Sequence, residues 1–288
     1  MKREFWLLLL LAALASSATA QSLQQVKKQA EATMVVTGHV DIEGDGRVSG
    51  HHLDNRARLP AYVIDLIDRA ARGWRFEPLL EDGEPIAARA PMGLRLVARP
   101  IADSDGDFQV GIDNGWFGHA PGESTDHVSV RGTLAQPSYP HDMARRRAEG
   151  TVYLAIKVGR DGSVEDVFAE RVNLRVYEPE KRMARLRQRF ADHTVRTARN
   201  WQFNPPSTGD RVDDDFWVVI VPIDYFIGTR QVDSGTWTQY VPGPLQPGPE
   251  WRHRQDGLAN SDALVAGQIQ MAGSGRRLLS ALDGDPAP

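Results

Sequence analysis

The stretches "RGWRFEP" (Arg72–Pro78) and "RNWQFNP" (Arg199–Pro205) place Trp, Phe and Pro at alternate positions, more than a hundred residues apart. Each follows a run with helical spacing. Trp and Phe two residues apart face the same side of an extended chain, and the proline prevents the helix from resuming. We therefore predict that aromatic side chains close a helix–sheet core in two places: Trp74 and Phe76 before Pro78, and Trp201 and Phe203 before Pro205.

Upstream of each stretch lies an alternating strand pattern. The first copy reads "GHVDIEGDGRVSGHHLDN" from Gly38, and the second reads "GTVYLAIKVGRDGSVEDVFAER" from Gly150. An Asp-Gly pair interrupts each pattern, at Asp45-Gly46 and at Asp161-Gly162. This signal is typical of a β-hairpin, and we expect a type I′ turn with positive φ at both central residues.

Between hairpin and aromatic stretch, apolar residues recur with helical spacing. The predicted helix faces comprise Val63, Leu66, Ile67, Ala70 and Trp74 in the first copy, and Met183, Leu186, Phe190 and Ala198 in the second. A last strand follows each, Ala88–Ala98 and Asp215–Phe226. The sequence thus predicts an α+β protein of two tandem β-β-α-β units, each a small antiparallel sheet packed on one helix.

The expected domain organisation follows from this repeat. Unit 1 spans 33–100 and unit 2 spans 136–230, and the Gly- and Asp-rich stretch 101–135 is predicted to be a linker. Residues 242–288, rich in Pro, Gly, Gln and Asp, are predicted to form a largely disordered tail. Within that tail only "RRLLSAL" (Arg276–Leu282) indicates a short helix.

The N-terminus has the pattern of an export signal. Lys2 and Arg3 precede the apolar run Phe5–Leu14, and Ala18-Thr19-Ala20 follows. Residues 1–20 therefore indicate a cleavable signal peptide and a periplasmic protein, with a retained inner-membrane anchor as the alternative. The run is shorter than the ~20 residues of a spanning helix. The 288 residues contain no cysteine, and a net charge of -4 gives no basic footprint for nucleic acid.

Tyr139-Pro140, "EGTVYLAIKVGRDGSVEDV" (Glu149–Val167) and "ARNWQFNPP" (Ala198–Pro206) resemble the C-terminal domain of TonB-family proteins. The motif of that family is a proline-rich stretch, G-x-V, a D-G turn, and W-x-F-x-P after the helix. The second copy matches every part, whereas the first lacks the Tyr-Pro pair. Together the copies cover a little over half of the chain.

The resemblance implies a function. TonB-family proteins couple a proton-driven inner-membrane motor to outer-membrane receptors, and their C-terminal domain pairs its last strand with a receptor peptide. This chain departs from the family by its cleavable-signal pattern and by the lack of a long Pro-rich spacer. We expect a periplasmic module that binds an extended peptide of an outer-membrane or periplasmic protein. The alternative function is that of an anchored energy transducer. A second copy of the chain, in a homodimer, is a further partner that we consider.

The expected binding edge is the last strand of the second unit. A small sheet covered by one helix leaves edges with unpaired backbone groups, which an added strand can use. The partner-binding residues predicted there are Phe216, Trp217, Val218, Val219, Ile220 and Val221. Pro222 removes one donor, and it indicates either protection of the edge or a bulge.

Signals for catalysis or metal binding are weak. The segment "DIEGDGRVSGHH" from Asp41 resembles a calcium loop but ends in His52 instead of Glu. The chain carries no H-E-x-x-H, G-x-S-x-G or phosphate-loop motif. We therefore predict no enzyme, metal or cofactor. One remaining alternative is an enzyme whose pocket is lined by "NGWFGHAPGE" (Asn114–Glu123). Another is docking onto lipid head groups or cell-wall polymer through the basic residues of Arg145–Arg147 and Glu180–Arg189.

Overall fold

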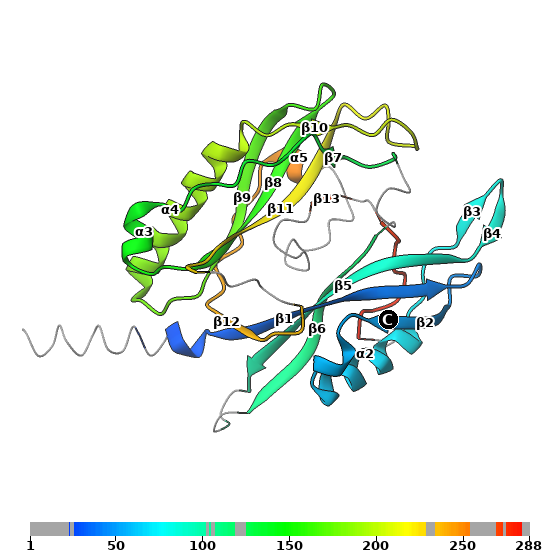
Figure 1. Cartoon of the computed structure of the whole chain (residues 1–288), viewed down its shortest axis with the longest axis horizontal. Helices are drawn as coiled ribbons and strands as arrows, with labels where there is room; N and C mark the ends of the chain where they lie inside the picture. Colours follow the sequence, from blue (N-terminus) through cyan, green and yellow to red (C-terminus); the bar gives the residue numbers. More distant parts are fainter. Residues whose placement is uncertain are drawn as a thin grey trace, which may run out of the picture.

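The computed structural model describes residues 23, 26–101, 104, 107–118, 125–228, 234–253, 269–272 and 275–283. The protein is a mixed α+β structure with two antiparallel sheets, each of which carries one long helix on one face (Figure 1). The predicted signal peptide, residues 1–20, lies outside the described residues. Among the helices that are described, none is long and apolar enough to cross a membrane.

The first sheet contains the N-terminal hairpin. Its strands are β1 (Glu31–Ile42), β2 (Val48–Leu53), β5 (Ala88–Pro100), β6 (Phe108–Phe117) and β12 (Thr238–Tyr240). β5 lies between β1 and β6, and both β2 and β12 pair with the other side of β1. The order β2-β1-β5-β6 therefore runs across this sheet.

Helix α2 (Ala61–Gly73) covers one face of the first sheet. Its buried residues Val63, Ile67, Ala70 and Ala71 follow helical spacing, as the sequence predicts for the first three. They pack against alternate residues of β1 and β5. Trp74 and Phe76 are fully buried at the end of the helix, and Phe117 of β6 meets both rings edge-on at 5.2 and 4.9 Å.

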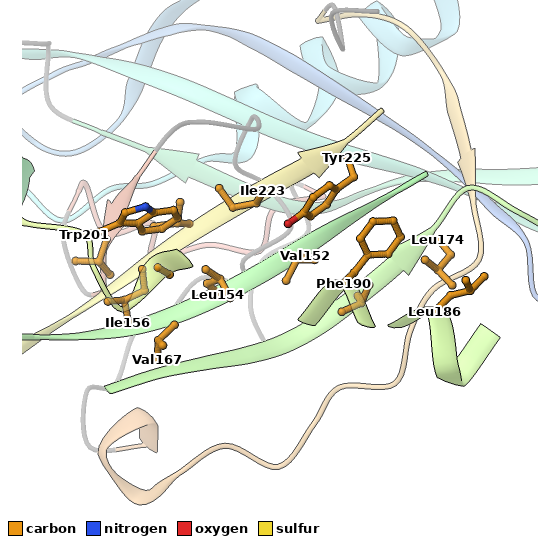
Figure 2. Packing of buried hydrophobic residues seen from close by; sticks show 14 of the residues in the cluster. Val152, Leu154, Ile156, Val167, Leu174, Leu186, Phe190, Trp201, Ile223 and Tyr225 are labelled. Carbon is orange, nitrogen blue, oxygen red and sulfur yellow. The ribbon is translucent and has the colours of Figure 1, made fainter. Parts of the chain in front are cut away.

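The second sheet repeats this arrangement of strands. It consists of β8 (Gly150–Gly159), β9 (Val164–Leu174), β11 (Phe216–Tyr225) and β13 (Gln270–Met271), in the order β13-β11-β8-β9. Helix α4 (Glu180–Ala198) packs on one face, and its buried residues include the four predicted ones, Met183, Leu186, Phe190 and Ala198. Figure 2 shows Phe190 and Leu186 beside Tyr225 and Leu174, with Trp201 at the other end of this core.

Shorter elements complete the fold. They are the 3-10 turn η1 (Arg56–Arg58), the hairpin β3 (Leu79–Glu81) with β4 (Glu84–Ile86), the pair β7 (Ser129–Val130) with β10 (Phe203–Asn204), and the helices α3 (His141–Arg145) and α5 (Glu250–His253). Several segments distant in sequence join the second core: Val26, Val128, Val241 and Met271 are all buried in it. The second core therefore includes residues from near both ends of the described chain.

The Asp-Gly turn of the first hairpin binds the aromatic stretch of the same sheet. The N–H of Phe76 donates to the carbonyl of Gly46 at 2.8 Å, and the backbones of Arg47 and Arg75 form an isolated antiparallel β-bridge. Gly46 has φ +84°, and a Cβ there would lie 2.0 Å from the carbonyl oxygen of Phe76. Only glycine allows both the left-handed backbone and this close approach.

The second turn makes the same contacts. The N–H of Phe203 donates to the carbonyl of Gly162 at 2.8 Å, Ser163 bridges to Gln202, and a Cβ on Gly162 would lie 2.0 Å from the carbonyl oxygen of Phe203. The predicted type I′ turn is wrong in both hairpins. Asp45 and Asp161 do not have positive φ, and a three-residue loop ends in the left-handed glycine instead. Each aspartate accepts the N–H two residues ahead, at 3.0 and 2.8 Å.

The Tyr-Pro pair of the second copy begins α3. The carbonyl of Pro140 accepts the N–H groups of Met143 and Ala144 at 3.0 and 2.9 Å. Tyr139 points back into the core, where its ring lies edge-on to Phe190 and Tyr225, and its hydroxyl donates to the carbonyl of Ala148. Burial raises the pKa of Tyr139 to about 12.

The stretch predicted as a linker, 101–135, contains sheet strands. β6 pairs with β5 over nine residue pairs, and β7 pairs with β10 beside the second aromatic stretch. Phe117 is buried, and Trp116 packs on the outer face of the second sheet. Of the pocket predicted at Asn114–Glu123, Asn114–Phe117 thus belong to a packed strand, and 119–123 lie outside the described residues.

The predicted disorder of 242–288 does not hold for the residues described there. Gly243 and Gln246 bond along the edge of β9, and α5 packs Trp251 against the outer face of the sheet. Instead of a helix, 276–282 runs extended beside the first aromatic stretch: the N–H of Glu77 donates to the carbonyl of Arg277, and the N–H of Leu279 to that of Arg75. These residues are ordered by contacts with distant parts of the chain, and the amino-acid composition of the segment itself does not predict such contacts.

The turn contact predicts a graded response to alanine. Gly46→Ala should cost at least about 2 kcal/mol more than Gly83→Ala, because it adds a backbone clash to left-handed strain. Gly83 is the matched control, since it has φ +85° but a Cβ added there would meet no atom within 4 Å. Chemical denaturation of both variants measures the difference. Equal losses would show that the Gly46–Phe76 approach does not constrain the fold.

Trp201 should carry much of the second core. Its side chain is buried and its indole N–H donates to the carbonyl of Ala135 at 2.9 Å. Trp201→Ala should cost about 3–5 kcal/mol in the full chain. The exposed neighbour provides the control, since Arg199→Ala should stay within about 0.5 kcal/mol. A loss below about 1 kcal/mol for Trp201→Ala would contradict the core assignment.

The buried tyrosines predict alkaline sensitivity. Burial raises the pKa of Tyr139, Tyr225 and Tyr240 above the ordinary value of 10. Folding therefore favours their neutral forms, so their stabilising contribution is intact below about pH 10 and is lost as pH rises through about 12. Phenolate absorbance should show fewer than the six tyrosines titrating near pH 10 while circular dichroism stays native. Titration of all six near pH 10 in the native state would refute this.

Candidate partner-binding edge of β11

The six residues predicted to bind a partner all lie on β11, and both faces of that strand are covered by other parts of the chain. Trp217, Val219 and Val221 point toward α4 and the main core. Val218 and Ile220 point to the opposite face, where Trp251 and Trp116 cover them. Phe216 is partly buried under Lys157, whose Nζ lies 4.6 Å from the ring centre. Their side chains are therefore packed, and only backbone groups along one edge can serve an added strand.

The hydrogen-bond pattern identifies which backbone groups face that edge. The carbonyl of Val218 accepts the N–H of Ala272 at 2.7 Å, so Val218 faces away from β8. In an antiparallel sheet successive residues face opposite edges. Ile220 and Pro222 therefore face outward with Val218, whereas Val219 faces β8. A proline at Val219 would disrupt the sheet itself and not only an external contact.

The chain itself occupies part of the edge. β13 pairs antiparallel with β11, Met271 opposite Val219 and Gln270 opposite Ile220. Met271 is buried in the main core with Ile269 packed against the same cluster, and Ala272 joins the cluster on the outer face. The short segment 269–272 thus alternates its side chains between the two faces, as a strand does.

Pro222 ends the usable edge without a bulge. β11 pairs with β8 in continuous register from Phe216 to Tyr225, with Pro222 opposite Tyr153. Pro222 occupies an outward-facing position, where its missing N–H breaks no bond to β8. This is the position that edge strands tolerate. Of the two sequence-based alternatives for Pro222, the geometry favours protection of the edge.

The first sheet shows a complete version of the same contact. β6 adds to the outer edge of β5, the strand that corresponds to β11, and pairs over nine residues. β13 pairs over two residues at the corresponding edge of β11. Sequence inspection missed both added strands, although "IQMA" (Ile269–Ala272) alternates apolar and other residues over a length too short to stand out.

Polar clusters elsewhere are internally paired, and one of them joins Glu31, Arg95, Arg99, Asp113 and Tyr240. His51 lies 2.8 Å from Asp68, and Arg56 beside the same carboxylate holds the pKa of Asp68 below its usual value, with a smaller contribution from His51. Arg89 similarly lowers the pKa of Asp41. The described residues contain no group of three or more His, Asp or Glu side chains able to hold a metal ion. His52 stacks on His39 at 5.1 Å between ring centres.

Comparison with known proteins adds no relative. No protein-family model matches the chain, and no curated protein or solved structure matches it. Function must therefore be argued from the residues and contacts described above.

Proposed function

We propose that this protein is a periplasmic protein-binding module built from two tandem β-β-α-β units that resemble the TonB C-terminal domain. In this proposal the second unit takes an extended segment of an outer-membrane or periplasmic protein along the outer edge of β11. The anchored energy transducer remains the alternative: it would require that residues 1–20 are retained as an anchor and that the chain functions without a long Pro-rich spacer.

Support for two related units comes from matched contacts and not from sequence alone. The orders β2-β1-β5-β6 and β9-β8-β11-β13 correspond strand by strand. Each aromatic stretch lies between its own Asp-Gly turn and a further segment, 276–279 in the first unit and 129–131 in the second. Each Trp indole donates to a carbonyl beyond the unit, Trp74 to Leu282 and Trp201 to Ala135.

The single observation that carries the function is the presence of β13 on β11. The outer edge of β11 accepts an extended, antiparallel segment through the backbone of Val218 and the core-facing side chain of Met271. Main-chain bonds supply affinity in such additions, and alternate side chains supply selectivity. The pairing of this segment with β11 in the same chain supports the proposal that a partner segment binds in the same way.

The occupying segment also indicates the form of the partner. Ile269 and Met271 face the main core, while Ala272 packs on the other face between larger side chains. A partner segment should therefore be extended, with unbranched or aliphatic residues at alternate positions and a small residue next to them. With only two residue pairs, β13 is a short occupant that a longer segment can replace.

A reversible cross-link tests whether this edge binds. The chain has no cysteine, and Val219 and Met271 are opposite one another in a non-hydrogen-bonded pair. Such pairs have Cα atoms about 4.5 Å apart, a separation that a disulfide can span. Full-length Val219→Cys/Met271→Cys is titrated with a labelled peptide of sequence Gly267–Gly273, oxidised and then reduced. The peptide should bind only the reduced form.

The single variant Met271→Cys is the matched control, since it loses the same side chain but cannot close the disulfide. Its peptide affinity should be independent of the redox state. Circular dichroism of both forms checks that the sheet is retained. Equal binding by the oxidised and reduced double variant would exclude this edge as the site.

A further inference from the structure

A hollow of about 420 Å³ lies between α3 and α4, and α4 covers the face of the second sheet opposite to the one on which Trp251 of α5 packs. Four exposed arginines surround it: Arg146, Arg182, Arg185 and Arg189. Its base is apolar and is formed by Met143, Ala148, Val176 and Leu186. We name this feature the arginine cleft. A cationic rim above an apolar base is complementary to an anionic amphiphile.

The arginine cleft has a surplus of positive charge. Asp142 pairs with Arg189, and Glu178 pairs with Arg182 at 3.2 Å. Arg146 and Arg185 form no ion pair with any residue in the described part of the chain. Two positive charges are thus left at the rim of a protein whose formal net charge is -4.

The end of α3, next to Arg146 of the cleft, holds an arginine in a left-handed backbone conformation. The N–H of Ala148 donates to the carbonyl of Met143 at 3.1 Å, and that of Arg147 to Ala144 at 3.0 Å. These are the two bonds of a Schellman cap, which places its C′ residue in the left-handed region. That residue is Arg147, with φ +51°, although glycine would adopt this conformation without strain. The exposed arginine therefore occupies a position that stability alone would assign to glycine.

The position of the cleft relates it to the N-terminal segment. Lys27 and Tyr177 line one hollow together, and the neighbours of Tyr177, Val176 and Glu178, line the arginine cleft. The apolar run Phe5–Leu14 ends twelve residues before Val26. Twelve residues span at most roughly 40 Å, so a bilayer that holds this run lies within about that distance of Val26.

We propose that the arginine cleft docks the protein on a bilayer that contains anionic phospholipid. Arg146 and Arg185 bind head-group phosphates, for which the planar guanidinium fork is well suited. Met143 and Leu186 face the less polar part of the same lipid. Docking adds a second attachment to an N-terminal anchor if the anchor is retained, and it is the only attachment if the signal is removed.

Vesicle sedimentation of residues 21–288 tests this docking, because the apolar run Phe5–Leu14 would itself enter either type of vesicle. The protein should sediment with vesicles of phosphatidylcholine mixed with phosphatidylglycerol and not with pure phosphatidylcholine. Arg185→Gln should lower partitioning roughly fivefold, the effect expected for one basic residue near an anionic surface. Added salt should weaken binding, because exposed charges are screened.

Two variants separate docking from folding and from net charge. Arg147→Gly should lower partitioning while raising stability, since it relieves the left-handed strain. Arg72→Gln changes the charge equally at the exposed end of α2, where no ion pair involves Arg72 in the part of the chain that is described. It should leave partitioning unchanged.

The proposal is overturned by equal sedimentation with both vesicle types, by an equal loss with Arg72→Gln and Arg185→Gln, or by binding of a soluble acidic polysaccharide without binding of vesicles. Displacement from vesicles by millimolar glycerol phosphate would indicate a free-phosphate site and would also reject the membrane. None of the residues substituted here lies on β11, so the result is independent of the peptide experiment.

Discussion

The hydrogen bond from the Phe N–H of each aromatic stretch to the glycine carbonyl of its hairpin turn determines the rest of the fold. It joins the tip of a hairpin to the segment that leaves the helix, at 2.8 Å in both sheets. Each helix must therefore return across its sheet before the last strand begins. Trp74 and Trp201 are buried at this junction, and the glycine is required because no side chain fits at 2.0 Å from the facing carbonyl.

The same constraint explains why the last strand of each sheet has an open side. β5 and β11 pair with the first strand of their hairpin, and the helix covers a face and not an edge. Unpaired edges invite added strands, and here the chain provides its own. β6 covers β5, and the C-terminal segment passes along β9, across the outer face through α5, and reaches β11 as β13.

Periodicity predicts the helices and strands that define each sheet, and the Asp-Gly pairs predict where the hairpins turn but not the type of turn. The helix faces with Val63 and Phe190, the last strands, and the buried aromatics were all predicted, because spacings of 3.6 and 2.0 residues reflect one-sided burial. β6 and β13 were not predicted, since both become strands only by pairing with distant partners. The sequence also does not predict that the backbone groups of Val218 face the outer edge of β11, because this depends on the register between β11 and β8.

The two added strands differ in length, and in our proposal this difference determines which sheet edge can release its own strand and bind a partner segment instead. β6 pairs over nine residues and places Phe117 between Trp74 and Phe76, so its removal would open the first core. β13 pairs over two, and Pro222 prevents it from extending in regular register. A tethered segment competes at an effective concentration in the millimolar range when its linker is short and flexible. If a partner binds the β11 edge as we propose, it must gain more contacts than Gln270–Met271 make, and only a long or well-matched segment would then replace β13.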